Sequence, residues 1–253
     1  PVVSGVLRRT DCGRITDGAA AVVLAGPAFA AEWARRGGRS QPPAITGWGH
    51  RTAPLALEDK LRAADDGPLL FPHVRAAVDD ALGRAGVAEV GALDVVELHD
   101  CFTISEYVAI DHLGITAPGE AWKAVEEGVV APGGALPLNP SGGLLGLGHP
   151  VGATGVRMAL DAWRQVTGGA GDYQVDGART AATLNMGGSF TTAENVRTYA
   201  GEAAWRFPFV TMSGTAGIST FDRFPNVKGR RFGGRAAVEF QNGDMSFCPT
   251  LAL

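Results

Sequence analysis

Three short motifs contain most of the side chains that could do chemistry in this sequence. They are His99-Asp100-Cys101-Phe102, Gly148-His149-Pro150 and Asn185-Met186-Gly187. A thiol and an imidazole within hydrogen-bond reach can act as nucleophile and base, because the imidazole favours the reactive thiolate. Glycines beside them, such as Gly148 and Gly187, let a substrate arm approach the backbone closely. The first hypothesis is therefore nucleophilic or general acid and base chemistry at a site that these motifs share.

Taken singly, each of these residues also has a purely structural explanation. A lone histidine is more often a satisfied core or surface group than a catalyst, and we treat three histidines in this way: His50, His73 and His112. Cys101 could be a small buried residue, and Asn139 could form a turn before Pro140. The glycines between 142 and 155 could shape a loop or cradle a phosphate, although a phosphate loop would end in Lys followed by Ser or Thr.

The sequence around the motifs predicts the elements that position them. Residues 93–98 predict a short strand that ends at His99, and 103–113 predict the helix that follows. Residues 180–184 predict a second strand, which ends at Asn185, and the loop around His149 leads into a helix over 157–166. The carboxyl ends of strands in an open α/β sheet face one crevice. We therefore predict that His99, Cys101, His149 and Asn185 line one pocket.

The rest of the chain predicts an α/β protein with a mixed sheet and helices. Strands are expected over 17–24 and 44–48, and helices over 28–36 and 71–87. Residues 54–68 are rich in charge and flanked by Pro, as in a surface loop or short helix. A strand over 190–199 and a hairpin at Asn242-Gly243 are also expected. We predict three parts: 1–39, a main domain over 40–200, and a mostly β appendage over 201–253.

Composition excludes several classes of protein. Of the 253 residues, 45% are hydrophobic and 19% charged, which is enough for a substantial core without disulfides or metals. The net charge is −4 and the sequence has only one short basic run, so it predicts no broad positively charged surface for binding nucleic acid. Three scattered cysteines, Cys12, Cys101 and Cys248, argue against a disulfide scaffold and a zinc site. With neither a long apolar run nor a signal peptide, we expect a cytoplasmic protein that does not enter membranes. Pro1 opens on what reads as mid-domain sequence, which leaves a processed or truncated parent open.

The motifs together resemble those of a known enzyme family. Residues 139–143 (Asn-Pro-Ser-Gly-Gly), followed by the loop 148–155, resemble the glycine–histidine–proline loop of thiolases. The motif at 99–102 is similar to the variant found in sterol-carrier-type thiolases, where other thiolases carry Asn-Glu-Ala-Phe. Residues 11–21 resemble the end of the N-terminal half of the same family. The resemblance covers roughly residues 1–199 and includes the whole C-terminal thiolase domain.

This resemblance implies a layered thiolase-like fold and a set of roles. The family has two similar βαβαβαββ halves and is usually dimeric, and this chain corresponds to the C-terminal half. By motif, His149 should activate the nucleophile and sit in an oxyanion hole, Cys101 should be the acid and base, and His99 should hold a water or the thioester oxygen. Asn185 stands where many thiolases have cysteine, which gives Cys101 more weight. The remaining members of the implied substrate site are Asn139, Ser141, Gly148 and Gly187.

The resemblance also implies what the chain works with. Coenzyme A esters are the expected substrates, with no cofactor and no metal. The nucleophilic cysteine belongs to the N-terminal half of the family, and neither Cys12 nor Cys248 lies in a nucleophile-like context. We therefore expect an acyl-CoA acyltransferase that is incomplete without that half, active in fatty acid or sterol degradation. The alternatives are an acyl-CoA-binding subunit or a retro-aldol lyase. A homo-oligomer, or a complex with a zinc-ribbon and OB-fold acyl-CoA-binding protein docked on the appendage, is the expected assembly.

Overall fold

The computed structural model describes residues 1–38, 40–54, 59, 62, 64 and 67–187, together with the backbone of 196–207, 210–221 and 231–240. The described chain falls into two compact units. The first contains every helix and strand up to Gly187, and the second contains the last three strands. The domain boundaries expected at residues 39 and 200 stay predictions.

A pair of parallel strands lies at the centre of the first unit. Strand β3 (Val95–Leu98) pairs with β4 (Ala181–Leu184) in a register that runs from Val95 opposite Ala181 to Leu98 opposite Leu184. All four residues of β3 are buried. A strand buried on both faces is typical of parallel sheets covered by helices. Because both strands run in the same direction, their carboxyl ends meet at one edge.

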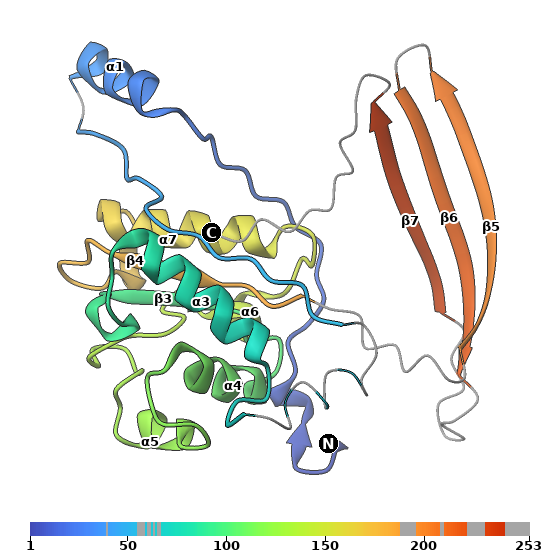
Figure 1. Ribbon diagram of the computed structural model, residues 1–253, viewed down its shortest axis with the longest axis horizontal. Helices are drawn as coiled ribbons and strands as arrows, with labels where there is room; N and C mark the ends of the chain where they lie inside the picture. The colour runs from blue at the N-terminus through green and yellow to red at the C-terminus, as the bar shows by residue number, and fades with distance from the viewer. Residues whose placement is uncertain are drawn as a thin grey trace. The chain divides into compact units, whose positions relative to one another are not determined.

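Helices cover both faces of this strand pair (Figure 1). On one face, α7 (Thr154–Thr167) packs against both strands. On the other face, Val96 and Leu98 join a hydrophobic core with α3 (Pro72–Ala85), α4 (Thr103–Leu113) and α5 (Ala121–Glu126). Leu98 and Ile110 are fully buried in this core, and burial of such a side chain contributes about 1.5–3 kcal/mol. The core therefore fixes the strand end from which His99 projects.

Shorter elements complete the first unit. Strands β1 (Val2–Ser4) and β2 (Leu7–Arg8) form a small antiparallel pair, and α1 (Pro27–Gly37) follows the extended residues 17–25. Helix α6 (Gly143–Leu147) lies between the turn at Asn139 and His149. Single 3-10 turns occur at Arg9–Asp11, Val90–Ala92 and Gly171–Tyr173. Within the described residues, no helix combines the length and apolar character needed to cross a membrane.

Most of the elements predicted in the first unit are confirmed. The helices expected over 28–36, 71–87, 103–113 and 157–166 are α1, α3, α4 and α7, and the strands expected over 93–98 and 180–184 are β3 and β4. The spacing of apolar residues in the sequence did not predict α5 or α6.

Two predicted strands are wrong. Residues 44–48 run extended across α3 and have no strand neighbour in the part of the chain that the structure describes. Gly47 and Gly49 allow this close approach because a side chain at either position would collide with the carbonyls of Ala81 or Ala77. Residues 17–24 are also extended but have no strand neighbour among the described residues. An apolar run forms a strand only where another strand completes its hydrogen bonds.

The second unit is a three-stranded antiparallel sheet in the order β5 (Val196–Phe207), β6 (Val210–Phe221) and β7 (Arg231–Phe240). The strand expected over 190–199 overlaps β5 only from Val196 onwards, and its first residues lie outside the described ones. The hairpin expected at Asn242-Gly243 and most of the segment 54–68 also lie outside the described residues.

Candidate active site

The register of the two central strands brings His99 and Asn185 together. Leu98 lies opposite Leu184, so the next residue of each strand emerges at the same edge, and His99 N–H donates to Leu184 O at 2.9 Å. His99 Nδ1 lies 2.6 Å from Asn185 Oδ1. An amide oxygen can only accept, so in this arrangement Nδ1 carries the imidazole proton. The other ring nitrogen, Nε2, then carries a lone pair.

His149 reaches the same place from a different part of the chain. Its ring lies edge-on to that of His99, with the centroids 4.9 Å apart and the planes at 88°. Its backbone is held by two hydrogen bonds: its N–H donates to Arg14 O at 2.8 Å, and its carbonyl accepts from Thr16 N–H at 3.3 Å. The N-terminal segment therefore sets the position of His149.

The hydrogen bonds of Thr154 define the tautomer of His149. His149 Nδ1 lies 2.8 Å from Thr154 Oγ1, and this hydroxyl donates to Pro150 O at 3.2 Å. A hydroxyl has a single proton, so Thr154 accepts from His149 Nδ1–H. Nε2 of His149 is then free to take up a proton.

Burial makes both imidazoles neutral bases near neutral pH. Burial is the main cause that lowers the pKa of His99, with a further lowering from His149 and opposing effects of Asn185 and Asp100. The pKa of His149 is also lowered chiefly by burial, and Asp100 opposes this shift. A neutral imidazole with a free Nε2 can accept a proton from a thiol or hold a water molecule.

Cys101 follows His99 by two residues, in the loop that leads into α4. Within the described chain, its Sγ has one hydrogen-bond partner, Ser105 Oγ at 3.6 Å, one helical turn further along α4. Its carbonyl accepts from Gly13 N–H at 2.8 Å, and the neighbouring Phe102 forms an antiparallel bridge with Cys12. The structure thus brings His99, His149 and Asn185 together, whereas a direct Cys101 to His149 pairing stays a prediction.

The four residues expected to bind substrate differ in what surrounds them. Asn139 Oδ1 accepts from Leu98 N–H at 2.7 Å, and the buried Ser141 donates its hydroxyl to Glu97 at 2.6 Å, so both side chains are turned towards β3. Gly148 adopts a φ of 100°, and Thr16 fills the space that a side chain there would occupy, whereas no described residue lies close to Gly187. The binding roles of all four residues stay predictions.

Three residues that sequence reasoning missed hold the site in place. Asp100 accepts from the N–H groups of Leu144 at 2.7 Å and Leu145 at 3.4 Å, so it caps α6. Glu97 binds Ser141, and Thr154 binds His149. Asp100 lies inside a predicted motif, but its partners are 44 and 45 residues away, and no local pattern shows such a pairing.

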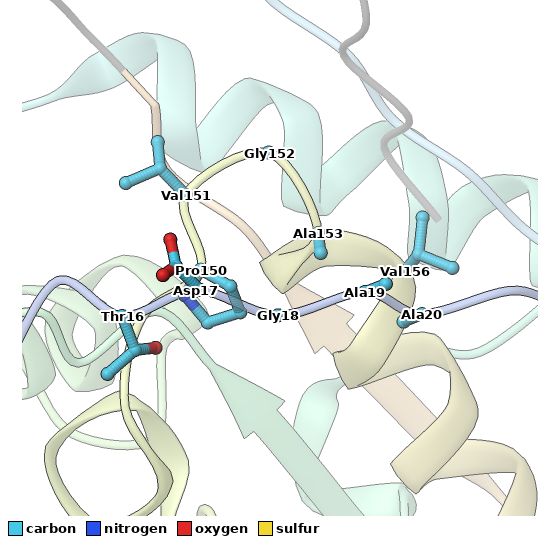
Figure 2. Close-up of a pocket in the computed structure, with 10 residues that line it drawn as sticks. All are labelled: Thr16, Asp17, Gly18, Ala19, Ala20, Pro150, Val151, Gly152, Ala153 and Val156. Atoms are coloured by element: carbon cyan, nitrogen blue, oxygen red, sulfur yellow. The ribbon is translucent and has the colours of Figure 1, made fainter.

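An open hollow of about 400 Å³ lies at Pro150, the residue after His149 in the sequence (Figure 2). Thr16, Asp17 and the small residues that follow them form one wall, and the turn from Pro150 to Ala153, with Val156, forms the other. Small and apolar lining residues suit an extended, flexible ligand. No group of three potential metal ligands occurs among the described residues.

Comparison with known proteins places these features in a family context. A family model described as "Thiolase C-terminal domain-like" matches residues 58–196. An "Acetyl-CoA acetyltransferase" of Methanothermobacter thermautotrophicus is 36% identical over 76% of this chain and 47% of its own length. "Sterol carrier protein 2" of Gallus gallus is 31% identical over 70% of this chain and 31% of its own. "Benzoylsuccinyl-CoA thiolase subunit BbsB" of Thauera aromatica is 30% identical over 78% of this chain and 48% of its own. The chain therefore spans less than half the length of each of these relatives.

Proposed function

From the premise that this chain belongs to the thiolase family, of which it contains the C-terminal domain, we propose that it forms part of an acyl-CoA acyltransferase. The reaction would form or break a carbon–carbon bond in acyl-CoA esters. The observation that supports this proposal most directly is the pair of neutral imidazoles, each with its proton fixed on Nδ1 and Nε2 left free. Such a pair suits thiol activation and the holding of a water or an oxygen beside it.

The proposed cycle assigns one step to each side chain. His149 Nε2 takes the proton of a nucleophilic cysteine from the N-terminal half, and the thiolate attacks the thioester carbon. The bond from that carbon to coenzyme A sulfur breaks, and coenzyme A leaves as a thiol with the proton that Cys101 gives up. The Cys101 thiolate then removes the α-proton of a second acyl-CoA, and the resulting carbanion attacks the acyl-cysteine. The thiolate of the N-terminal half is then released.

His99 and Asn185 are proposed to act together on an oxygen. With the Asn185 oxygen facing Nδ1, the free Nε2 of His99 accepts a hydrogen bond, which suits a water molecule. If the Asn185 amide rotates so that its NH₂ group faces Nδ1, the imidazole proton moves to Nε2 and can bind the thioester oxygen. The orientation of the amide therefore decides between the two roles assigned to His99.

An exposed apolar segment supports the need for the N-terminal half. The main-chain groups of residues 18–25 have no hydrogen bonds to other described residues, and Val23 and Leu24 are 95% and 64% exposed. An extended apolar segment with unpaired N–H and C=O groups needs a neighbouring strand to cover it. We propose that the N-terminal half supplies this neighbour together with the nucleophilic cysteine.

Acetyl-CoA provides the decisive test. We expect the purified chain to bind it weakly and reversibly, with no covalent adduct by intact mass, because the family's nucleophilic cysteine belongs to the N-terminal half. Co-expression with the N-terminal half of the Methanothermobacter relative as a separate polypeptide should give an acyl-cysteine on that half and measurable thiolysis. His149→Asn should reduce turnover by roughly 10²- to 10⁴-fold, while His50→Asn, at an exposed position, should not.

A different result would change the assignment. A stable acetyl adduct on Cys101 of the chain alone, with turnover abolished by Cys101→Ser, would mean that this chain is a self-sufficient enzyme. Carbon–carbon cleavage without any acyl-enzyme would favour the retro-aldol lyase. Binding that never leads to turnover, even with the N-terminal half present, would favour an acyl-CoA-binding subunit.

The remaining parts of the proposal concern assembly and setting. We propose a cytoplasmic protein of fatty acid or sterol degradation that needs no metal or cofactor and works as a dimer or with a zinc-ribbon and OB-fold partner. Residues 201–253 are proposed to be a mostly β appendage that contacts this partner or a second subunit, as the phenylalanine-rich sequence suggests. A chain that ends at Ala200 should change its oligomeric state by light scattering or lose solubility. An unchanged state would count against a docking role.

A further inference from the structure

Glu97 is a fully buried carboxyl group two residues before His99. It is 1% exposed, and its two oxygens accept both polar hydrogens of Ser141: Oε1 from the N–H at 3.2 Å and Oε2 from the hydroxyl at 2.6 Å. None of the steps assigned above uses this group. A buried carboxyl that binds both donors of one residue is a specific anchor for that residue.

The other bonds of Ser141 fix the direction of this contact. Its Oγ also accepts from Gly143 N–H at 3.3 Å and from Arg157 Nη1 at 3.4 Å. A hydroxyl has one proton and two lone pairs, so these contacts leave only its proton for Glu97. Glu97 therefore accepts from Ser141 with both of its oxygens.

The anchored turn leads directly to His149. Ser141 lies in a turn closed by Gly142 N–H to Asn139 O at 2.9 Å, and α6 begins at Gly143. Asp100 holds the N–H groups of Leu144 and Leu145 in the first turn of α6, which ends at Leu147, two residues before His149. Glu97, in β3, and Asp100, just after it, thus hold the segment 141–147, which leads to His149 and so positions it beside His99.

The charges around Glu97 set its protonation near neutrality. Burial is the largest effect and raises its pKa to about 7, although the two Ser141 hydrogen bonds lower it. The charged groups that face it come from α7: Asp161 raises the pKa and Arg157 lowers it. Asp161 is itself buried and accepts from Arg157, Arg164 and Tyr173. Glu97 keeps an acceptor for the Ser141 hydroxyl in either protonation state, because a protonated carboxyl group retains its carbonyl oxygen.

We propose that Glu97 is a positioning residue of this site, which fixes the turn at Ser141 and, through α6, holds His149 against His99. The importance of His149 and His99 for catalysis rests on the proposed function, whereas the positioning itself does not.

NMR on the chain without substrate tests the positioning. We expect the Glu97 carboxyl carbon, the Ser141 and Leu144 amides, and the His149 ring signals to share one midpoint near pH 7. Glu97→Gln removes that midpoint because an amide does not titrate, and it leaves one of the two Ser141 donors facing the NH₂ group. At about pH 8, after correction for intrinsic rates, the Ser141 amide should exchange roughly tenfold to a hundredfold faster in this variant.

Asp94→Asn is the matched control, because Asp94 lies at the other end of β3 and holds Thr180 through its N–H at 2.8 Å. It should release Thr180 and leave Ser141 and His149 unchanged. The proposal is overturned if the wild-type loop follows only the histidine midpoints below 6.5, or if Asp94→Asn and Glu97→Gln act alike. If Glu97→Gln does not fold, the same NMR signals of Ser141→Ala and the titration of the wild type test the proposal instead. None of these readouts uses acyl-CoA, so failure of the proposed function would appear separately.

Discussion

Thr154 offers a direct test of how the protein fixes the tautomer of its proposed base. Its side chain is 1% exposed, and its hydroxyl accepts from His149 Nδ1 at 2.8 Å while donating to Pro150 O at 3.2 Å. Thr154→Val keeps the shape and removes both bonds. Pro150 O keeps two backbone donors, Ala153 N–H and Thr154 N–H, so His149 Nδ1 is the atom that loses its partner.

The expected loss of stability follows from the one hydrogen-bond partner that His149 Nδ1 loses. A buried donor without an acceptor costs about 1–3 kcal/mol, but His149 can move its proton to Nε2 and leave a lone pair at Nδ1. We therefore expect Thr154→Val to lower the free energy of unfolding by roughly 1–2 kcal/mol and to shift His149 towards the Nε2–H tautomer. Thr154→Ser keeps the hydroxyl and loses one methyl group, at about 1 kcal/mol, with the tautomer unchanged.

Urea unfolding and the ¹⁵N shifts of the His149 ring measure the two effects separately. Because the two substitutions have similar costs in stability, the tautomer is the sharper readout. The reasoning is refuted if Thr154→Val leaves the His149 proton on Nδ1, or if Thr154→Ser moves it as far as Thr154→Val does. Full turnover of the complemented enzyme with Thr154→Val would show that the tautomer does not matter to catalysis.

Two further predictions concern stability. Gly148→Ala should lower the free energy of unfolding, measured in urea, by more than about 1 kcal/mol, because φ is 100° and the new Cβ would lie 2.7 Å from Thr16 Cγ2. Gly146→Ala is its control, because the space beside Gly146 in α6 is open among the described residues, and it should be neutral or stabilising. His112 accepts from Phe71 N–H and donates to Val108 O, and burial lowers its pKa, so the folded state binds fewer protons than the unfolded state. Its contribution to stability is therefore complete above about pH 6.5 and is lost as the pH falls below that value, so the difference between wild type and His112→Gln should shrink in acid.

The fold was predictable from sequence where local pattern and burial agree. Helices α3, α4 and α7 have apolar residues at helical spacing, and β3 is β-branched and bounded by turns, so each was found within a few residues. The run at residues 17–24 has an equally apolar pattern and is not a strand. A pattern shows that a segment is able to pair, but the presence of a pairing strand is a property of the assembled fold.

The site was predictable as a set of loops but not as a set of contacts. The positions of His99 and Asn185 followed from the rule that parallel strands end at one edge, and their 2.6 Å contact agrees with it. The inward orientation of Ser141 did not follow, because its partner Glu97 is 44 residues away and had been counted only as part of a strand. Sequence places motifs on elements, whereas the hydrogen bonds between distant loops require the coordinates.

The shifted pKa values of the site act on stability in opposite directions. His99 and His149 have lowered pKa values, so the folded state gains stability as the pH rises towards about 6.5. Glu97 has a pKa raised from 4.5 to about 7, so the folded state binds the extra proton, and this contribution is lost as the pH rises from about 4.5 to 7. The form with neutral imidazoles and an ionised Glu97 exists only above both ranges. Ionisation of Glu97 therefore costs stability as the pH approaches neutrality, whereas the loss of protons from the two histidines at lower pH does not.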